Sequence, residues 1–247
     1  MRSLVCIITV GLLAAAAPPA SAQTVDELVA RHIEARGGYQ RLKAIQTIRI
    51  TRTVATPFSD VRVIVYKKRP NLYRAEQGPV QAGAVLSARA VNGDVAWDTN
   101  PDGTVTARPA AAAAETREID GDFDGLLVDW KENGHSVTLD GGEKLASGET
   151  YKLKVKTKSG VERTLYLDAA TCLERRQTGV LNLPGGRQFN VVIDFDNYRE
   201  VGGVKFAHDI NEERAGQEPV QSLVTYTEKI ELDVPMDDGL FAMPVVK

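Results

Sequence analysis

Residues 151–167 read YKLKVKTKSGVERTLYL. In the first half, the apolar residues Tyr151, Leu153 and Val155 alternate with lysines, and an apolar alternation resumes after Ser159-Gly160. A period of two residues is typical of a β-strand with one buried face and one face in water. A Ser-Gly pair between two such runs indicates a turn. The stretch therefore predicts two antiparallel strands joined by a hairpin.

The same alternation recurs along the chain from Ile48 onward, and short turn sequences separate the runs. The clearest runs are residues 61–65, 189–195, 204–210 and 220–226, and the turns include Asn92-Gly93, Gly141-Gly142 and Gly202-Gly203. Short turns join antiparallel neighbours, whereas parallel strands need long crossovers that are usually helical. We predict one mainly antiparallel β domain, in which each sheet has one dry face and one wet face.

The N-terminus has the layout of a secretory signal peptide. Arg2 precedes an apolar run over residues 4–17, which Pro18-Pro19 ends before the small residues Ala20-Ser21-Ala22. This run is shorter than the roughly 20 residues that span a bilayer. We predict a signal peptide over residues 1–22 that is cleaved between Ala22 and Gln23. The domain at residues 23–247 would then lie in a bacterial periplasm, with no membrane span.

Charge and cysteine content restrict the partners and the source of stability. The chain has 30 Lys and Arg against 33 Asp and Glu, a net charge of −3. Such a balance gives no global attraction for nucleic acid, so we exclude nucleic acid as a partner. Cys6 lies in the predicted signal peptide, which leaves Cys172 alone in the domain. Without an intramolecular disulfide, stability must come from apolar burial.

Two segments have helical rather than strand patterns. Thr24 and Glu27 form a capping-box sequence at the start of a helix over about residues 25–36, which Gly37-Gly38 would end. A second segment, residues 108–132, interrupts the strand pattern. Its large apolar residues fall at i, i+3, i+4 and i+7, the spacing of one helical face; they are Phe123, Leu126, Leu127 and Trp130. We expect both helices to cover the apolar face of the sheet.

Several motifs of the chain resemble one known family. They are Ala35-Arg-Gly-Gly38, Leu42-Lys-Ala-Ile-Gln-Thr-Ile48, Lys68-Arg-Pro-Asn71, Asp122-Phe-Asp-Gly-Leu-Leu-Val-Asp129, Tyr198-Arg-Glu-Val-Gly-Gly-Val-Lys-Phe206 and Asp238-Gly-Leu-Phe-Ala-Met-Pro244. Together these segments resemble the outer-membrane lipoprotein-sorting proteins of the LolA/LolB-like superfamily. The likeness covers nearly the whole chain after residue 22, although the chain is longer than the dedicated lipoprotein carriers.

The resemblance implies a curved antiparallel sheet, an incomplete β-barrel, with helices on its concave side. Members of the family hold lipid or acyl groups between sheet and helices. Residues 108–132 would then form a lid, with Phe123, Leu126, Leu127 and Trp130 toward the sheet. Trp130 could equally line a cavity or fill a core. Trp97 is expected in the core and is kept as a candidate cavity residue.

The acidic segment Asp120-Gly-Asp-Phe-Asp-Gly125 begins like a calcium-binding loop. The twelfth position of such a loop should be glutamate, but here it is Lys131, whose charge would repel the ion. We expect the acidic N-terminus of a helix instead, where carboxylates are favoured. No histidine pair has metal-ligand spacing, so we predict no metal and no cofactor.

The remaining chemically interesting residues favour structural roles. Lysines 152, 154, 156 and 158 are expected on the solvated face of a strand, where Glu162 could pair with some of them. His32, His135 and His208 are expected to be structural, with His208 the most buried. Cys172 is expected to be a small core or edge residue of a strand. No nucleophile elbow, zinc-protease, phosphate-loop or dinucleotide motif is present.

These observations favour a non-enzymatic periplasmic binding protein or carrier. Its ligand would be a hydrophobic small molecule, a lipoprotein acyl chain or another envelope lipid, exchanged with donor or acceptor proteins of the envelope. An envelope interaction or scaffold module with the same fold and a filled core is the alternative. An enzyme with an unrecognised hydrolytic site is a third hypothesis.

Overall fold

The computed structural model describes residues 23–56, 59–81, 83–182, 188–216 and 220–244. The predicted signal peptide, residues 1–22, lies outside the described residues. Within the described part, no helix has both the length and the apolar character needed to cross a membrane.

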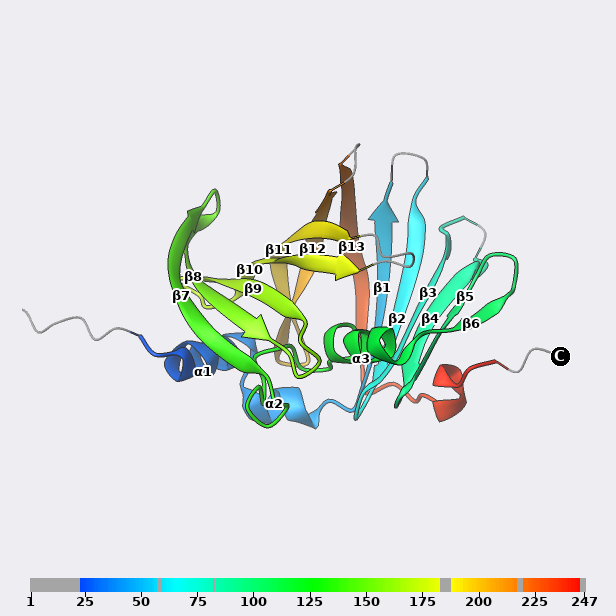
Figure 1. Cartoon of the computed structure of the whole chain (residues 1–247), viewed down its shortest axis with the longest axis horizontal. Coiled ribbons are helices and arrows are strands. Elements are labelled where there is room, and N and C mark those ends of the chain that lie inside the picture. The colour runs from blue at the N-terminus through cyan, green and yellow to red at the C-terminus, as the bar shows by residue number, and fades with distance from the viewer. Residues whose placement is uncertain (1–22, 57–58, 82, 183–187, 217–219, 245–247) are drawn as a thin grey trace, which may run out of the picture.

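The described chain is dominated by one open sheet of thirteen strands, curved into an incomplete barrel (Figure 1). All neighbouring strands are antiparallel. The prediction of a curved antiparallel sheet accompanied by helices is confirmed. The strands are β1 (Thr47–Ala55), β2 (Val61–Lys68), β3 (Leu72–Pro79), β4 (Ser87–Asn92), β5 (Val95–Thr99), β6 (Val105–Ala107), β7 (Ser136–Leu145), β8 (Gly148–Lys156), β9 (Glu162–Asp168), β10 (Glu174–Asn182), β11 (Gln188–Val201), β12 (Val204–Ala215) and β13 (Gln221–Leu232).

The order of the strands forces one long connection across the sheet. From β1 the chain meanders outward to β6, and from β7 at the opposite edge it meanders back to β13, which pairs with β1. Residues 108–135, hereafter the crossover segment, must therefore pass from one edge of the sheet to the other. In Figure 1 this segment and its helix lie on the concave side of the sheet.

Helix α1 (Val25–Arg36) begins with the predicted capping box, because Thr24 and Glu27 hydrogen-bond each other's backbone amides. It ends at Gly37, whose φ of 126° favours glycine. A Cβ built at Gly37 would lie 2.1 Å from the carbonyl oxygen of Gly203, so this helix end packs backbone to backbone against the β11–β12 turn. The short helices α2 (Tyr39–Ala44) and η2 (Asp238–Phe241) lie near opposite ends of the chain.

The crossover segment differs from its predicted structure. Its helix, α3 (Ala110–Ile119), ends before the apolar residues that were expected to form a helical face, and residues 120–134 run mainly as turns and bends. Gly125 and Asp129 have φ values of 97° and 52°, outside the right-handed helical region. The predicted helix over 123–130 is therefore wrong. Asp120 caps the C-terminus of α3, so the expected acidic helix N-terminus is wrong as well.

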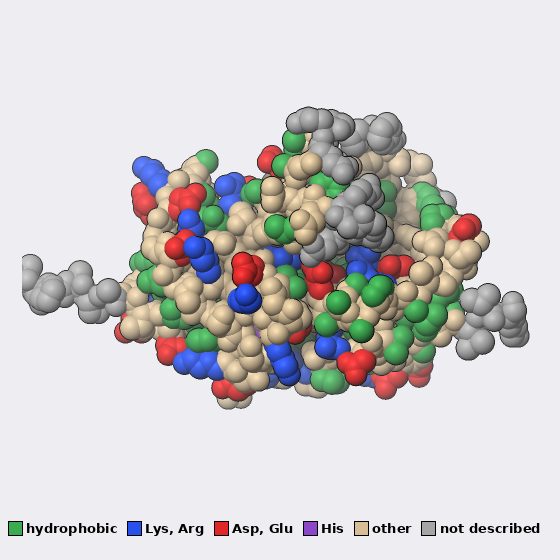
Figure 2. Space-filling view, viewed as in Figure 1, with side chains coloured by type: hydrophobic (Ala, Val, Ile, Leu, Met, Phe, Trp, Pro, Cys, Tyr) green, Lys and Arg blue, Asp and Glu red, His purple; other side chains and the backbone are tan. Residues whose placement is uncertain are grey.

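Helix α3 buries only a narrow face. Ala113 and Thr116 are buried against the sheet, and α3 packs on β4 and β5. In the space-filling view, apolar side chains gather over the position of α3, next to acidic and basic side chains near the centre of the molecule (Figure 2). The crossover is thus attached to the sheet chiefly by the turns that follow α3.

Those turns complete two apolar clusters. Phe123 and Val128 join a cluster built from α2, β1, β2, β3, β12 and β13. Leu126 and Leu127 join a second cluster of α1 with β7, β8 and β9. The crossover segment consequently packs against both halves of the concave face.

Candidate functional site

A cavity of about 460 Å³ lies between the concave face of the sheet and the crossover segment. This volume falls within the roughly 300–1,000 Å³ of typical small-molecule sites. Apolar side chains from five strands form much of its wall. They are Ile48, Ile50, Val65, Ile193, Phe195, Phe206, Ile210 and Ile230.

The five predicted site residues separate into two groups. Phe123, Leu126 and Leu127 line the cavity from the crossover side, and all three are buried. Trp130 packs instead at the edge of the second apolar cluster, with the Lys131 ammonium 4.9 Å from its ring centre. Trp97 is fully buried in a separate cluster with Ala88 and Ala90. The structure thus brings three of the five residues together at the cavity.

Trp97 lies apart from the cavity and contacts the C-terminal helix η2. Its indole N–H donates to the carbonyl oxygen of Phe241 at 3.2 Å, and the Arg74 guanidinium lies 5.2 Å from its ring centre. The hydrogen bond ties β5 to η2, the C-terminal segment.

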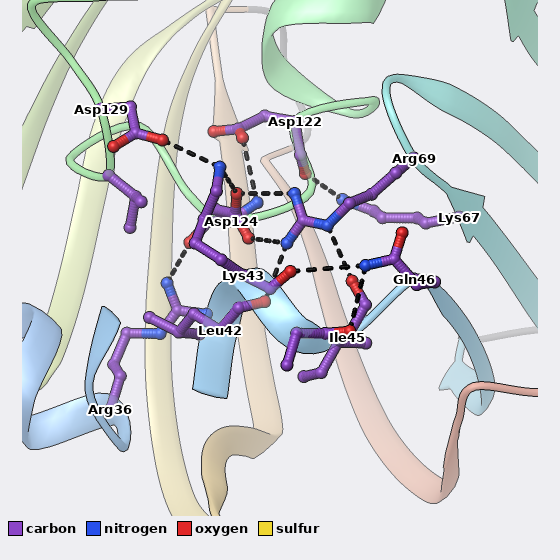
Figure 3. Close-up of polar contacts among 12 residues, drawn as sticks. Arg36, Leu42, Lys43, Ile45, Gln46, Lys67, Arg69, Asp122, Asp124 and Asp129 are labelled. Carbon is purple, nitrogen blue, oxygen red and sulfur yellow. Dashed lines mark hydrogen bonds and ion pairs between the residues drawn. The ribbon is translucent and has the colours of Figure 1, made fainter. Parts of the chain in front are cut away.

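An ion-pair network holds the crossover segment against α1, α2 and the turn between β2 and β3 (Figure 3). The Arg69 guanidinium donates to both carboxylate oxygens of Asp124, at 2.9 and 2.6 Å. The Lys43 ammonium bridges the carboxylates of Asp124 and Asp129, at 3.0 and 2.8 Å. Arg36 also donates to the carbonyl oxygen of Asp124. Burial opposes ionisation of Asp124, but hydrogen bonds from Arg69 and Lys43 outweigh it and lower its pKa.

Arg69 also contacts the backbone at the C-terminal end of α2 and an aromatic ring of the crossover segment. It donates to the carbonyl oxygens of Ile45 and Leu42, at 2.7 and 2.8 Å, and stacks 4.2 Å from the centre of the Phe123 ring. Two of the motifs quoted above, residues 68–71 and 122–129, therefore meet here. Residues 35–38 and 198–206 likewise meet at Gly37 and Gly203. These motifs are contact segments of the fold.

The acidic segment, residues 120–125, contributes carboxylates to this network. Asp124 pairs with cations, and Asp122 accepts a hydrogen bond from the Asp124 amide at 3.1 Å. Within the described ranges, no cluster of three or more His, Cys, Asp or Glu side chains is arranged to hold a metal ion.

Sequence reasoning missed a set of charged side chains in the cavity wall: Arg36, Arg52, Lys67, Asp120, Asp122, Glu174, Lys205 and Glu212. Two could have been found from strand register, because Arg52 follows Ile48 and Ile50, and Lys67 follows Val63 and Val65, at the same period of two. Glu174 has a buried Oε1 atom without a hydrogen-bond partner among the described residues. Burial raises the pKa of Glu174 to about 7, although the nearby Arg36 charge opposes the rise.

His32 and Cys172 meet beside the cavity. The buried His32 ring donates its Nδ1 proton to the carbonyl oxygen of Cys172 at 2.9 Å, and burial lowers the pKa of His32 to about 4. Cys172 is buried in the turn between β9 and β10 with a φ of 57°, so its predicted place within a strand is wrong. His208 is buried, but His32 is equally buried, so the expectation that His208 is the most buried histidine is wrong.

Three lysines of the predicted row, Lys152, Lys154 and Lys156, pair with carboxylates. Lys152 and Lys154 lie 3.5 and 3.2 Å from Asp140. Lys156 lies 3.1 Å from Glu162, the partner that the sequence suggested. These pairs are partly or largely exposed, as expected for a solvated sheet face.

Solved structures of other proteins share this architecture. A LolA superfamily protein from Nitrosomonas europaea aligns over 90% of this chain and 98% of its own, with a TM-score of 0.60 and 14% identity. A DUF1329 family protein from Desulfovibrio piger aligns over the same shares with a TM-score of 0.61 and 13% identity. A domain titled as an outer membrane lipoprotein-sorting protein, from Vibrio parahaemolyticus, covers 86% of this chain and 94% of its own, with a TM-score of 0.55 and 14% identity.

At the level of sequence, no protein-family model matches the chain and no curated protein is significantly similar to it. The likeness is therefore one of fold, and it extends over nearly all of the described residues. The predicted resemblance is confirmed at that level: the chain has a LolA-like fold.

Proposed function

We propose that the protein is a periplasmic binding protein or carrier for a hydrophobic ligand, such as a lipoprotein acyl chain or another envelope lipid. The observation that carries the proposal is the cavity, whose wall combines apolar strand residues with Phe123, Leu126 and Leu127. It acts by binding and release, without catalysis, and exchanges its ligand with envelope proteins. The LolA-like neighbours, one of them titled as lipoprotein-sorting, support this choice.

The attachment of the crossover segment suits reversible binding. Burial of apolar surface contributes about 25 cal/mol per Å², so 100 Å² contributes roughly 2.5 kcal/mol. A hydrocarbon tail that covers a similar area can therefore replace the contacts of a few crossover side chains at little net cost. The ion pairs of Asp124 keep the segment anchored while its apolar residues move. Such a near balance allows a ligand to enter and to leave.

Filling the cavity tests the proposal. Ile193 on β11 lines the cavity, while its neighbour Val192 points to the other face of the strand. We expect Ile193→Trp to weaken binding of a fluorescent fatty acid by at least about tenfold, because the indole occupies ligand space. A tenfold loss of affinity corresponds to about 1.4 kcal/mol. Val192→Trp should leave the affinity within about twofold of the wild type.

Fluorescence titration of both variants, with thermal unfolding to verify their folds, supplies the measurement. Equal affinities of Ile193→Trp and the wild type would place the ligand elsewhere. Failure of the wild type to bind any acyl probe would favour an interaction or scaffold module without a ligand.

A further inference from the structure

One cationic side chain faces the cavity without a counter-charge. Arg52 lies on β1 at the same inward register as Ile48 and Ile50, and it lines the cavity with them. Its Nε atom is buried and lacks a hydrogen-bond partner, and no carboxylate among the described residues forms an ion pair with its guanidinium. Burial lowers the pKa of Arg52, yet a guanidinium stays charged at neutral pH. The side chain is half-buried, and a charge held partly out of water without a partner is unfavourable.

A second polar atom without a partner lies beside it. Thr227 on β13 pairs with Arg52 in the β1–β13 ladder, immediately after a register shift between Thr51 and Arg52. Paired residues share a face of the sheet. Thr227 is buried, and its Oγ1 atom has no hydrogen-bond partner in the described structure. A hydroxyl can donate one hydrogen bond. Arg52 and Thr227 therefore present unused donors from adjacent strands.

Two other donors, on β2 and β3, line the cavity near Arg52. The Lys67 ammonium on β2 donates to the carbonyl oxygen of Asp122 at 2.6 Å, which uses one of its three protons. Tyr73 on β3 also lines the cavity, and burial raises its pKa, so its hydroxyl stays protonated. The carboxylates of Asp120 and Asp122 share the cavity. Burial raises the pKa of both groups, and the nearby Lys67 charge opposes the rise.

We propose that Arg52, with Thr227 beside it, binds the oxyanion of an amphiphilic ligand, a carboxylate or a phosphate whose hydrocarbon tail occupies the apolar part of the cavity. The planar guanidinium matches two oxygens of either group in a bidentate contact. The inference rests on the proposed function and adds the chemical class of the ligand: an anionic amphiphile is preferred to a neutral one of equal chain length.

Three amphiphiles with the same sixteen-carbon chain test this preference: palmitate, hexadecyl phosphate and hexadecanol. By calorimetry, the wild type should bind at least one anionic probe about tenfold or more tightly than hexadecanol, because a charge-assisted hydrogen bond is lost with the alcohol. Arg52→Met should remove the preference and leave hexadecanol affinity within about twofold. The control Arg49→Met, on the other face of β1 near Glu231, should keep the preference.

Thr227→Val provides a second test, since it keeps the shape of the side chain and removes only the hydroxyl. It should reduce the preference for the anion by a smaller factor than Arg52→Met. In thermal unfolding, Arg52→Met without ligand should melt no lower than the wild type, because a half-buried charge without a partner has been removed. The rise in Tm that palmitate causes in the wild type should shrink in this variant.

The outcomes separate the two proposals. Equal binding of anion and alcohol by the wild type, or an unchanged preference in both Arg52→Met and Thr227→Val, would overturn the role of Arg52 while hydrophobic binding stands. Binding of none of the three amphiphiles would overturn the proposed function and this inference together. Inorganic phosphate or acetate binding as tightly as the amphiphiles would assign Arg52 to a free anion instead.

Discussion

At the scale of single residues, burial shifts the pKa values of Glu174 and His32 in opposite directions. Burial raises the pKa of Glu174 from 4.5 to about 7, and burial lowers the pKa of His32 from 6.5 to about 4. Both groups line the cavity, so its charge depends on pH. The two pKa shifts change the pH dependence of stability in opposite directions.

The sign follows from which state binds more protons. Between pH 4.5 and 7 the folded protein holds a proton on Glu174 that the unfolded chain has released, so stability falls as pH rises through this window. Between pH 6.5 and 4 the unfolded chain protonates His32 while the folded protein does not, so stability falls as pH falls. In the wild type the two contributions partly cancel between pH 4.5 and 6.5.

The variant Glu174→Gln isolates the first contribution. We expect its free energy of unfolding, relative to the wild type, to rise by about 1–3 kcal/mol between pH 5 and pH 8, because the buried charge no longer forms. The upper bound is reduced because Glu174 retains some exposed surface. Urea denaturation at several pH values measures the difference. Glu200→Gln, at an exposed position of β11, is the control; equal pH profiles for the wild type and Glu174→Gln would contradict the argument.

Some residue roles could be predicted from the sequence and others could not. The register of β1 places Arg52 among inward apolar residues, so the charge in the cavity is visible in the sequence. The lack of a partner for Arg52 or Glu174 depends on which distant segments pack nearby, and no local pattern records it. Trp97 and Trp130 share size and apolarity with cavity residues, yet their tertiary neighbours place them elsewhere.

At the scale of elements, the crossover segment combines a correct and a wrong prediction. An insertion near residues 108–132 was expected, and a helix is present there, but it covers 110–119. The i, i+3, i+4, i+7 spacing of Phe123 to Trp130 predicts a helix, whereas Gly125 and Asp129 adopt left-handed φ values. Successive turns can also place apolar residues with this spacing in one core. The spacing alone therefore cannot distinguish a helix from a series of turns.

The anchoring role of Asp124 can be measured. Asp124→Asn leaves Arg69 without its carboxylate partner and leaves Lys43 with Asp129 alone. The Asp124 and Arg69 side chains are only 10% and 18% exposed. We expect a loss of about 2–4 kcal/mol in the free energy of unfolding, slightly below the range for fully buried pairs. Asp94→Asn breaks the exposed Asp94–Arg117 pair, which joins α3 to the turn before β5.

Chemical denaturation of the two variants gives the comparison. Asp94→Asn should change stability by less than about 1 kcal/mol, as exposed pairs generally do. Similar losses for both variants would show that the Asp124 network does not anchor the crossover segment.

At the scale of the whole molecule, the fold class follows from the sequence but the strand order does not. Alternating apolar residues and short turns predict antiparallel neighbours, and twelve hydrogen-bonded strand pairs are antiparallel. The β1–β13 pairing joins residues far apart in the chain, such as Ile48 and Leu232. No local signal in the sequence specifies this pairing. Because β1 pairs with β13, the crossover segment must pass over the concave face between the two edges of the sheet.

The central claim, that the concave cavity holds a lipid, is tested most directly by the content of the cavity in the native protein. The measurement is mass spectrometry of organic extracts from protein purified out of its native bacterial envelope without detergent, with Ile193→Trp purified in parallel. The account predicts an acyl-chain lipid that is enriched in the wild type, approaches one molecule per chain, and is depleted in the variant. Extracts of the wild type that contain no more lipid than those of Ile193→Trp would contradict it.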